Sequence, residues 1–316
     1  MSLRFHSIIL LALTFLPVQA ADRVSLKQTK KTLTLMRGKV PILTYHVAAV
    51  PPPKGVDRVF DRSGFIHPIY APAGGMVTGI HPGDHYHHFG LWHAWVMTKY
   101  NGKKGPDFWN LKARTGRVRH AEIKAVRDSG FTVVQEQVAY LEGPEVEPAV
   151  ILAETLAVDA TFVKGANVID YVLAQKNVSP KPLILPAYRY GGGIAYRGPL
   201  SWNKTNSDYL TSEGLNRTNS HTSRARWVAM FGPTEKDGVK AATVAILCHP
   251  KNYDAPQHIR TWDNGKIFFN YVPIQETAWA INPGETVTLR YRLVILDGQV
   301  SAKPLEKRWK EYSKQD

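Results

Sequence analysis

The strongest constraint on the fold of this chain is a series of short runs in which apolar and polar residues alternate. Alternation at every second residue is the pattern of a half-buried β-strand, whereas an amphipathic helix repeats about every 3.6 residues. The runs are rich in Val, Ile, Thr, Tyr and Phe, and Gly, Pro, Asn and Asp separate them, as in strands and turns. They lie at residues 32–36, 40–46, 117–126, 131–141, 153–162, 168–177, 225–231, 242–248, 266–272, 276–281 and 286–296.

The connections between these runs predict antiparallel sheets. Residues 37–39 and 127–130 contain glycine and join neighbouring runs directly, as hairpin turns do. Strands do not alternate with helices, which excludes a parallel sheet of the Rossmann type. So many strands exceed one open sheet, and we therefore predict an all-β fold, a large antiparallel two-sheet β-sandwich. Apolar residues at helical spacing within residues 304–312 predict a short C-terminal helix.

The first twenty residues resemble an export signal rather than part of the fold. Arg4 precedes an apolar run over residues 8–16, and Val18-Gln19-Ala20 has the small-x-small pattern of a cleavage site. The run is too short to span a bilayer, and no later run is longer, so we expect no membrane span. The predicted organisation is a signal peptide (1–20), a single β-sandwich domain (21–300) and a helical tail (301–316). We expect the mature protein to be secreted, in the bacterial periplasm.

The charge and the cysteine count limit the partners. The chain carries 40 Lys and Arg against 26 Asp and Glu, a formal charge of +14, which favours an acidic partner. The basic residues are spread along the chain without a nucleic-acid-binding motif, so we expect no nucleic acid. Export then points to an acidic glycan. The single cysteine, Cys248, excludes an intrachain disulfide and a four-cysteine zinc site.

Histidines and aromatic residues concentrate in HPGDHYHHFGLWHAW, residues 81–95. In an extended segment His85 and His87 would point to one face, where two imidazoles can share a metal ion or bracket a substrate oxygen. Asp84 could orient one imidazole through its ring N–H. The alternative is that these histidines cap loops and satisfy buried backbone groups. Four histidines and an aspartate so close together favour a functional site.

Other clusters contain further candidate residues. Asp107 lies in GPDFW (105–109), and Tyr190 and Arg197 flank a triple glycine in residues 186–199. This glycine run lacks the GxxxxGK[ST] pattern, so it does not indicate nucleotide binding. His249 and Arg260 follow a predicted strand. The serine-hydrolase pattern GxSxG and the zinc pattern HExxH are both absent.

Several of these motifs together resemble the PmoA-like family of secreted bacterial proteins. They are FIHPIYAPAGGMVT (65–78), DHYHHFGLW (84–92), NGKKGPDFW (101–109) and YGGGIAYRGP (190–199). Tyr86 and Phe89 stand where the family usually has Pro and Arg. The family bears the inherited label "methane oxygenase", but the particulate enzyme needs a multi-span membrane subunit, so we do not expect that activity. A fold-level resemblance to galactose-mutarotase-like super-sandwich proteins implies a groove that holds a sugar.

We therefore predict a carbohydrate-active enzyme, an epimerase, lyase or hydrolase that uses His/Asp acid–base chemistry. A non-catalytic glycan-binding protein of the same fold is the alternative, and a His-ligated metal-dependent oxidoreductase is a third. The favoured function requires no cofactor, and a divalent metal would have His85 and His87 as candidate ligands. The candidate catalytic residues are His85, His87, His88, Asp84, Asp107 and His249, and the candidate substrate-binding residues are Trp92, Trp109, Tyr190, Arg197 and Arg260.

Overall fold

The computed structural model describes residues 23–143 and 145–315. The chain is mostly β, and its strands form two eight-stranded sheets and one four-stranded sheet. Every pairing between named strands is antiparallel, as the sequence predicted. The predicted signal peptide lies outside the described residues. Among those residues, no helix is long and apolar enough to cross a membrane.

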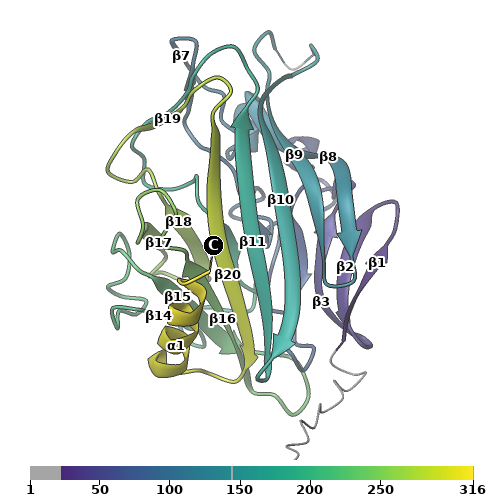
Figure 1. Cartoon of the computed structure of the whole chain (residues 1–316), viewed down its shortest axis with the longest axis vertical. Coiled ribbons are helices and arrows are strands. Elements are labelled where there is room, and N and C mark those ends of the chain that lie inside the picture. The colour runs from purple at the N-terminus through teal and green to yellow at the C-terminus, as the bar shows by residue number, and fades with distance from the viewer. Residues whose placement is uncertain (1–22, 144, 316) are drawn as a thin grey trace, which may run out of the picture.

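The second large sheet contains the longest strands, which stand side by side in the centre of Figure 1. Along its central strands, buried residues alternate with half-buried ones. The alternation in the sequence therefore corresponds to one buried face of this sheet. In spatial order the sheet consists of β14 (Asp208–Thr211), β15 (Trp227–Pro233), β16 (Ala241–Cys248), β20 (Thr286–Asp297), β11 (Ala166–Asn177), β10 (Ala149–Val163), β9 (Gly130–Ala139) and β8 (Gly116–Arg127).

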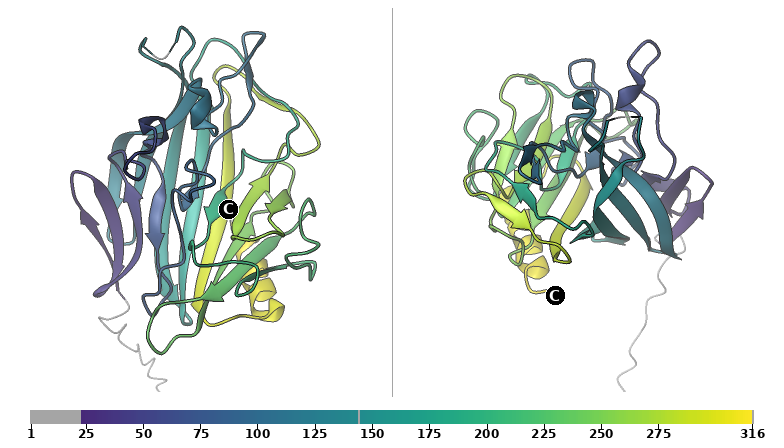
Figure 2. Two further views of the ribbon diagram at one scale, coloured as in Figure 1. Left: turned by 180° about the vertical axis from the view of Figure 1, so that it is seen from behind. Right: turned by 90° about the horizontal axis from the view of Figure 1, so that it is seen from above.

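The first large sheet lies behind the second in Figure 1 and faces the viewer in the left view of Figure 2. It joins strands from both ends of the chain, so segments far apart in sequence become neighbours. In spatial order it consists of β1 (Val24–Gln28), β2 (Thr32–Arg37), β3 (Val40–His46), β4 (Ile66–Ile69), β5 (Leu91–Trp92), β13 (Ala195–Arg197), β18 (Phe268–Val272) and β17 (His258–Thr261).

The two-sheet prediction omitted a small third sheet. Its strands are only two or three residues long, and so short a segment shows no periodicity. The connecting segments also include two short 3₁₀ helices, η2 (Arg58–Phe60) and η3 (Leu111–Ala113). In spatial order the small sheet consists of β19 (Trp279–Ile281), β12 (Leu183–Leu185), β6 (Lys99–Tyr100) and β7 (Lys103–Lys104).

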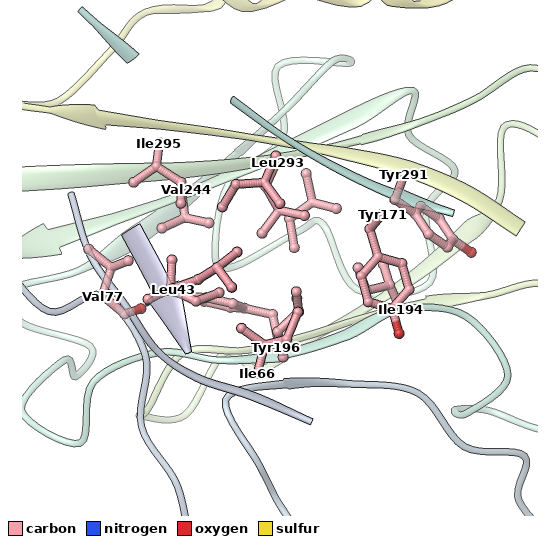
Figure 3. Packing of buried hydrophobic residues seen from close by; sticks show 14 of the residues in the cluster. Leu43, Ile66, Val77, Tyr171, Ile194, Tyr196, Val244, Tyr291, Leu293 and Ile295 are labelled. Atoms are coloured by element: carbon pink, nitrogen blue, oxygen red, sulfur yellow. Dashed lines mark hydrogen bonds between the residues drawn. The ribbon is translucent and has the colours of Figure 1, made fainter. Parts of the chain in front are cut away.

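The main core fills the space between the two large sheets (Figure 3). Leu43 and Tyr196 of the first sheet are fully buried, as are Leu293 and Ile295 of the second. Each fully buried aliphatic or aromatic side chain stabilises the fold by about 1.5–3 kcal/mol. Cys248 belongs to this core and is buried, as an isolated thiol at the end of an apolar strand should be.

The predicted C-terminal helix is confirmed as α1 (Ala302–Tyr312), which covers the outer face of the second sheet at β15 and β16 (Figure 1). Its apolar side chains Leu305 and Tyr312 are buried against that face, with Trp227 and Leu247 on the sheet side. A helix contacts a sheet through only one stripe of its surface, and the exposed Lys and Glu residues of α1 lie outside that stripe.

Candidate functional site

The order of strands in the first sheet brings three distant segments together. Strands β5, β13, β18 and β17 are neighbours, so residues near 85, 197 and 262 meet at one edge of the sheet. The segment before β5 forms the His-rich turn, which we define as residues 80–90 and which a bridge between Ile80 and Phe89 closes. The segment between β17 and β18 is the 262–267 loop, which contains Trp262 and Lys266.

The His-rich turn is folded, not extended, and this corrects the expectation that His85 and His87 share one face of a strand. The amide of His85 donates to the carbonyl of Pro82, and the amide of His88 donates to that of His85. These two turns place residues three apart on one side. The rings of His85 and His88 therefore stack with centroids 4.8 Å apart, whereas the rings of His85 and His87 are tilted by 66° at 5.6 Å.

Gly90 is the residue that lets this turn return to the sheet. Its φ is +65°, a left-handed conformation that side chains rarely adopt. A Cβ at this position would lie 2.5 Å from the carbonyl oxygen of Ile66 on β4. The close approach of the turn to the first sheet therefore depends on a residue without a side chain.

A pocket of about 460 Å³ lies between the His-rich turn and the 262–267 loop. We call it the turn–loop pocket. Its side chains are accessible but not fully solvated: Asp84 is 47% exposed and His85 is 35% exposed. Polar groups converge on it from three segments beside the ring of Trp262, which makes it a candidate ligand site with an unusually polar lining. The residues that line it include Asp84, His85, His221, Arg260, Trp262 and Lys266.

Asp84 is an ionised carboxylate held by cations. Burial alone would raise its pKa, but the hydrogen bond from Lys266 and the charge of Arg197 outweigh burial and lower that pKa below its usual value. The Lys266 ammonium lies 3.1 Å from the carboxylate, and the Arg197 guanidinium lies 3.9 Å away. Nδ1 of His85 is 3.4 Å from the same carboxylate without forming a hydrogen bond to it, so Asp84 acts on that imidazole through its charge.

The histidines of the turn are neutral at neutral pH. Burial lowers the pKa of His85, and the charges of Arg197 and Lys266 lower it further, whereas the Asp84 carboxylate raises it. Burial, with repulsion from His85, lowers the pKa of His87 to about 4. His88 is 2% exposed, and burial lowers its pKa well below the usual value. A neutral imidazole can accept a proton, and among the three His85 is the one that lines the pocket.

Arg197 lies beneath the pocket and is fully buried. Its three guanidinium nitrogens have no hydrogen-bond partner among residues 23–143 and 145–315. Its guanidinium carbon is 5.1 Å from the centre of the Trp262 ring, a cation–π arrangement. Burial lowers its pKa to about 10, so it stays charged and places a fixed positive charge behind Asp84 and Trp262.

The tryptophans predicted to stack on a substrate are not accessible. Trp92 is 1% exposed and Trp109 is 2% exposed, and both rings pack against His88 below the pocket. Apolar alternation marks them equally well as core or as site, so the sequence could not decide. The accessible aromatic ring is Trp262, which is half-buried and lies 4.9 Å from the His85 ring. The predicted site did not include Trp262 or Lys266.

Two predicted catalytic residues have other partners. Asp107 is 7% exposed, and its carboxylate accepts hydrogen bonds from the amides of Trp109 and Asn110 and from the Asn110 side chain. Through Asn110 it supports the hydroxyl of Tyr190. His249 lies beside α1, where Nε2 is 3.0 Å from the carbonyl of Gln315 and the ring packs against Tyr312. The structure does not bring His249 to the pocket.

Tyr190 and Arg260 form the remaining side of the site. Arg260 lines the pocket, and its guanidinium carbon lies 5.5 Å from the centre of the Tyr190 ring. The Arg189 guanidinium lies 5.9 Å from the same ring. Burial lowers the pKa of Arg260, and the charge of Arg189 lowers it further. Of the predicted binding residues, Tyr190, Arg197 and Arg260 thus lie at or beside the pocket.

A second polar cluster lies between the two large sheets, and we call it the interior polar cluster. Glu154 on β10 is fully buried, and its Oε1 accepts a hydrogen bond from Gln137 at 2.6 Å and another from Gln175. His93 lies 3.4 Å from the same oxygen, and the Arg62 guanidinium donates to the His93 carbonyl at 2.8 Å. Among the described residues, Glu154 Oε2, His93 Nδ1 and two Arg62 nitrogens have no hydrogen-bond partner.

His85 and His87 were predicted as possible metal ligands on the expectation that their segment is extended. Within residues 23–143 and 145–315, no group of three His, Cys, Asp or Glu side chains has an arrangement that could hold a metal ion. The folded turn stacks His85 on His88 rather than aligning it with His87, so the two predicted ligands do not share one face.

Comparison with known proteins gives a family match. The model of a family of unknown function, DUF6807, matches residues 32–310. No curated protein matches the chain. None of these matches carries the PmoA-like label, so that resemblance stays a prediction from the motifs.

Similar solved structures include a galactose mutarotase related enzyme from Lactobacillus acidophilus, with 10% identity over 88% of this chain and 98% of that chain and a TM-score of 0.44. A galactose mutarotase-like protein from Lactobacillus casei has 11% identity over 86% of this chain and 99% of that one, with a TM-score of 0.40. Heparan sulfate lyase HepC from Pedobacter heparinus has 8% identity, and the match covers 89% of this chain but 36% of the lyase, with a TM-score of 0.38.

Proposed function

We propose that this chain, which belongs to the DUF6807 family of unknown function, is a carbohydrate-active enzyme whose site is the turn–loop pocket. One observation carries the proposal. A neutral, partly exposed imidazole, His85, lies 3.4 Å from the carboxylate of Asp84 and 4.9 Å from the ring of Trp262 in a single pocket. A base, a charge that stabilises its protonated form and a flat apolar surface are the parts that acid–base chemistry on a sugar requires.

His85 is the general base of this proposal. Nδ1 faces Asp84, so Nε2 is the nitrogen left for the substrate. Nε2 removes a proton from a sugar hydroxyl or ring carbon, and the positive charge that forms on the imidazole is stabilised by the Asp84 carboxylate. When the proton comes from a ring carbon, its electron pair forms a C=C bond as the neighbouring C–O bond breaks, and the proton then moves to the leaving oxygen. When it comes from the anomeric hydroxyl, a C=O bond forms as the ring C–O bond breaks, and the proton then moves to the ring oxygen. Lys266 and Arg197 hold Asp84 ionised for this task.

Trp262 is the binding surface of the proposal. Its ring is half-buried, Arg197 lies 5.1 Å from its centre, and Phe268 packs at 4.8 Å. These contacts fix the ring before any ligand arrives, and a preformed apolar surface lowers the entropy lost on binding. The C–H face of a sugar ring can stack on it while hydroxyl groups point toward His85.

The decisive experiment is turnover of an oligosaccharide panel by the wild type and by His85→Gln. We expect one panel member to be converted by the wild type, with turnover reduced about 10²–10⁴-fold in the variant. The pH profile of kcat/KM should have its acid limb below pH 6.5, because burial lowers the pKa of His85 below that value and the base must be neutral. Affinity for the oligosaccharide should change less than tenfold.

Binding without turnover across the panel would contradict the enzyme and favour the glycan-binding alternative. His120→Gln is a matched control, because His120 is half-buried but lies at Tyr45, away from the pocket. Its turnover should equal that of the wild type.

Secretion to the periplasm and kinship with the PmoA-like family are parts of the same proposal. The first twenty residues support the former, and the motifs at 65–78, 84–92 and 101–109 support the latter. Fractionation of expressing cells, with N-terminal sequencing of the mature chain, tests export: a mature chain that begins at Ala21 supports it, and an uncleaved cytoplasmic chain contradicts it.

A further inference from the structure

Two arginines beside the turn–loop pocket have no carboxylate partner. Arg260 lines the pocket and Arg189 lies next to it, and both guanidinium groups lie within 6 Å of the centre of the Tyr190 ring, at 5.5 and 5.9 Å. Neither forms an ion pair or a side-chain hydrogen bond within residues 23–143 and 145–315. By contrast, Arg127 and Arg292 each contact an aspartate at 2.7–2.8 Å.

The two guanidinium groups are close enough for the charge of Arg189 to lower the pKa of Arg260, and such repulsion without a nearby anion is unfavourable, more so where water is partly excluded. Arg260 is half-buried, so part of its hydration is lost. The cation–π contact with Tyr190 offsets only a fraction of that loss, because such contacts contribute about 0.5–1 kcal/mol at exposed sites. The arrangement is therefore suited to an anion that arrives from outside.

The surrounding charges reinforce this preference. Arg197 is fully buried behind Trp262 and adds a fixed positive charge to the pocket. Asp84 is already engaged by Lys266 at 3.1 Å, and Asp263, whose charge acts on His221, forms no ion pair with Arg260 or Arg189 among the described residues. Cations in a low-dielectric pocket raise the local concentration of an anionic ligand.

We propose that the ligand of the turn–loop pocket is an anionic sugar, whose carboxylate or sulfate group binds Arg260 and Arg189 while its ring stacks on Trp262. Planar guanidinium groups fit both anions because they donate two parallel hydrogen bonds. This inference rests on the proposed function for the position of the sugar ring. Part of the charge of +14 is thus concentrated here, because Arg260 lines the pocket, Arg189 lies beside it at Tyr190 and Arg197 lies behind Trp262.

The test is calorimetric binding of matched probes. They are a trigalacturonate, its carboxyl-reduced neutral counterpart, and a sulfated heparin disaccharide. We expect the wild type to bind at least one anionic probe tenfold or more tightly than the neutral one, with affinity that falls as salt rises. In the double variant Arg189→Gln/Arg260→Gln the ratio between anionic and neutral probes should fall to about one. The single variant Arg260→Lys keeps the charge and should retain part of the preference.

Two controls separate this inference from the proposed function. Arg127→Gln removes an exposed arginine on β8 that pairs with Asp159, and it should leave the ratio unchanged. His85→Gln should remove turnover but keep the preference for the anion. Equal binding of neutral and anionic probes by the wild type, no binding of any probe, or a preference that survives the double variant overturns the anion site, whereas anion binding without turnover overturns only the enzyme.

Discussion

The turn–loop pocket and the interior polar cluster are built from the same kinds of residue and do different things. Each combines an arginine, an imidazole and a carboxylate, and the stretch 81–95 contributes to both, with His85 in the pocket and His93 in the interior. The difference is access. Asp84 and His85 are 47% and 35% exposed, whereas the side chains of Glu154 and His93 are 0% and 1% exposed.

This difference separates chemistry from stability. A carboxylate in the interior is held by Gln137 and Gln175 and cannot meet a ligand, so its contribution is to the fold. Removing one member there leaves a charge buried without compensation. A carboxylate in the pocket keeps part of its hydration, and replacing it changes the free energy of unfolding little, so its contribution is to reactivity. Residue type is the same in both places, and burial decides the role.

The largest expected effect is on stability, in the interior. Glu154→Ala should lower the free energy of unfolding by about 3–5 kcal/mol, because Arg62 and His93 then lie buried without the carboxylate. Urea unfolding measures this. Glu136→Ala is the matched control on the neighbouring strand β9, where the carboxylate pairs with half-exposed Arg119, and it should cost no more than about 1 kcal/mol. Similar losses for both variants would contradict the distinction.

The next effect is on turnover, in the pocket. Asp84→Asn should reduce kcat about 10–100-fold, because the amide no longer stabilises the positive charge on His85, while the unfolding free energy changes by less than about 1 kcal/mol. Steady-state kinetics and urea unfolding together measure this. Asp128→Asn, which removes an exposed partner of Arg23, should change neither quantity. Unchanged kcat in Asp84→Asn would remove Asp84 from the mechanism.

A smaller effect is expected on ligand affinity. Trp262→Leu should weaken binding of the oligosaccharide about tenfold, since a branched aliphatic side chain offers less flat surface than an indole. Trp279→Leu is a suitable comparison, because Trp279 is also half-buried but does not line the pocket. Its ring stacks on that of Tyr253 with the centroids 4.1 Å apart. Calorimetry on both variants would show whether the loss is specific to Trp262.

The smallest effect concerns pH. The folded-state pKa of His87 is about 4, below its usual 6.5, so the unfolded chain takes up the proton first as pH falls. The contribution of His87 to stability is therefore complete well above pH 6.5 and is lost as pH falls towards 4, by about 0.8 kcal/mol at pH 6. In His87→Gln the decline in unfolding free energy over this range should be shallower. An identical decline would place its origin elsewhere.

The fold could be predicted to the extent that it is periodic. The alternating run at 153–162 lies in β10, and Leu305, Trp309 and Tyr312, at helical spacing, lie in α1. Both could be predicted because burial of one face requires apolar residues at regular intervals in the sequence. The third sheet could not be predicted, since β6, β7, β12 and β19 are too short to have a period.

The site could be predicted only in part, because local hydrogen bonds and strand order decide it. Density of histidines pointed to Asp84 and His85, but nothing in HPGDHYHH reveals that the carbonyl of Pro82 receives the amide of His85 and folds the segment. Trp262 lies far from both in sequence and joins them only because β17 and β18 are placed next to β13. His249 has the same chemistry as His85, and the sequence could not tell that it would pack against α1.

The lone thiol has a practical consequence. Cys248 is buried in the main core, and burial raises its pKa to about 11, so its sulfur stays protonated and out of reach of an alkylating reagent in the folded protein. A cysteine introduced at an exposed position such as Asn264, on the rim of the turn–loop pocket, would then be the single reactive handle of the molecule. A fluorophore attached there could report the arrival of a ligand through its emission, one molecule at a time.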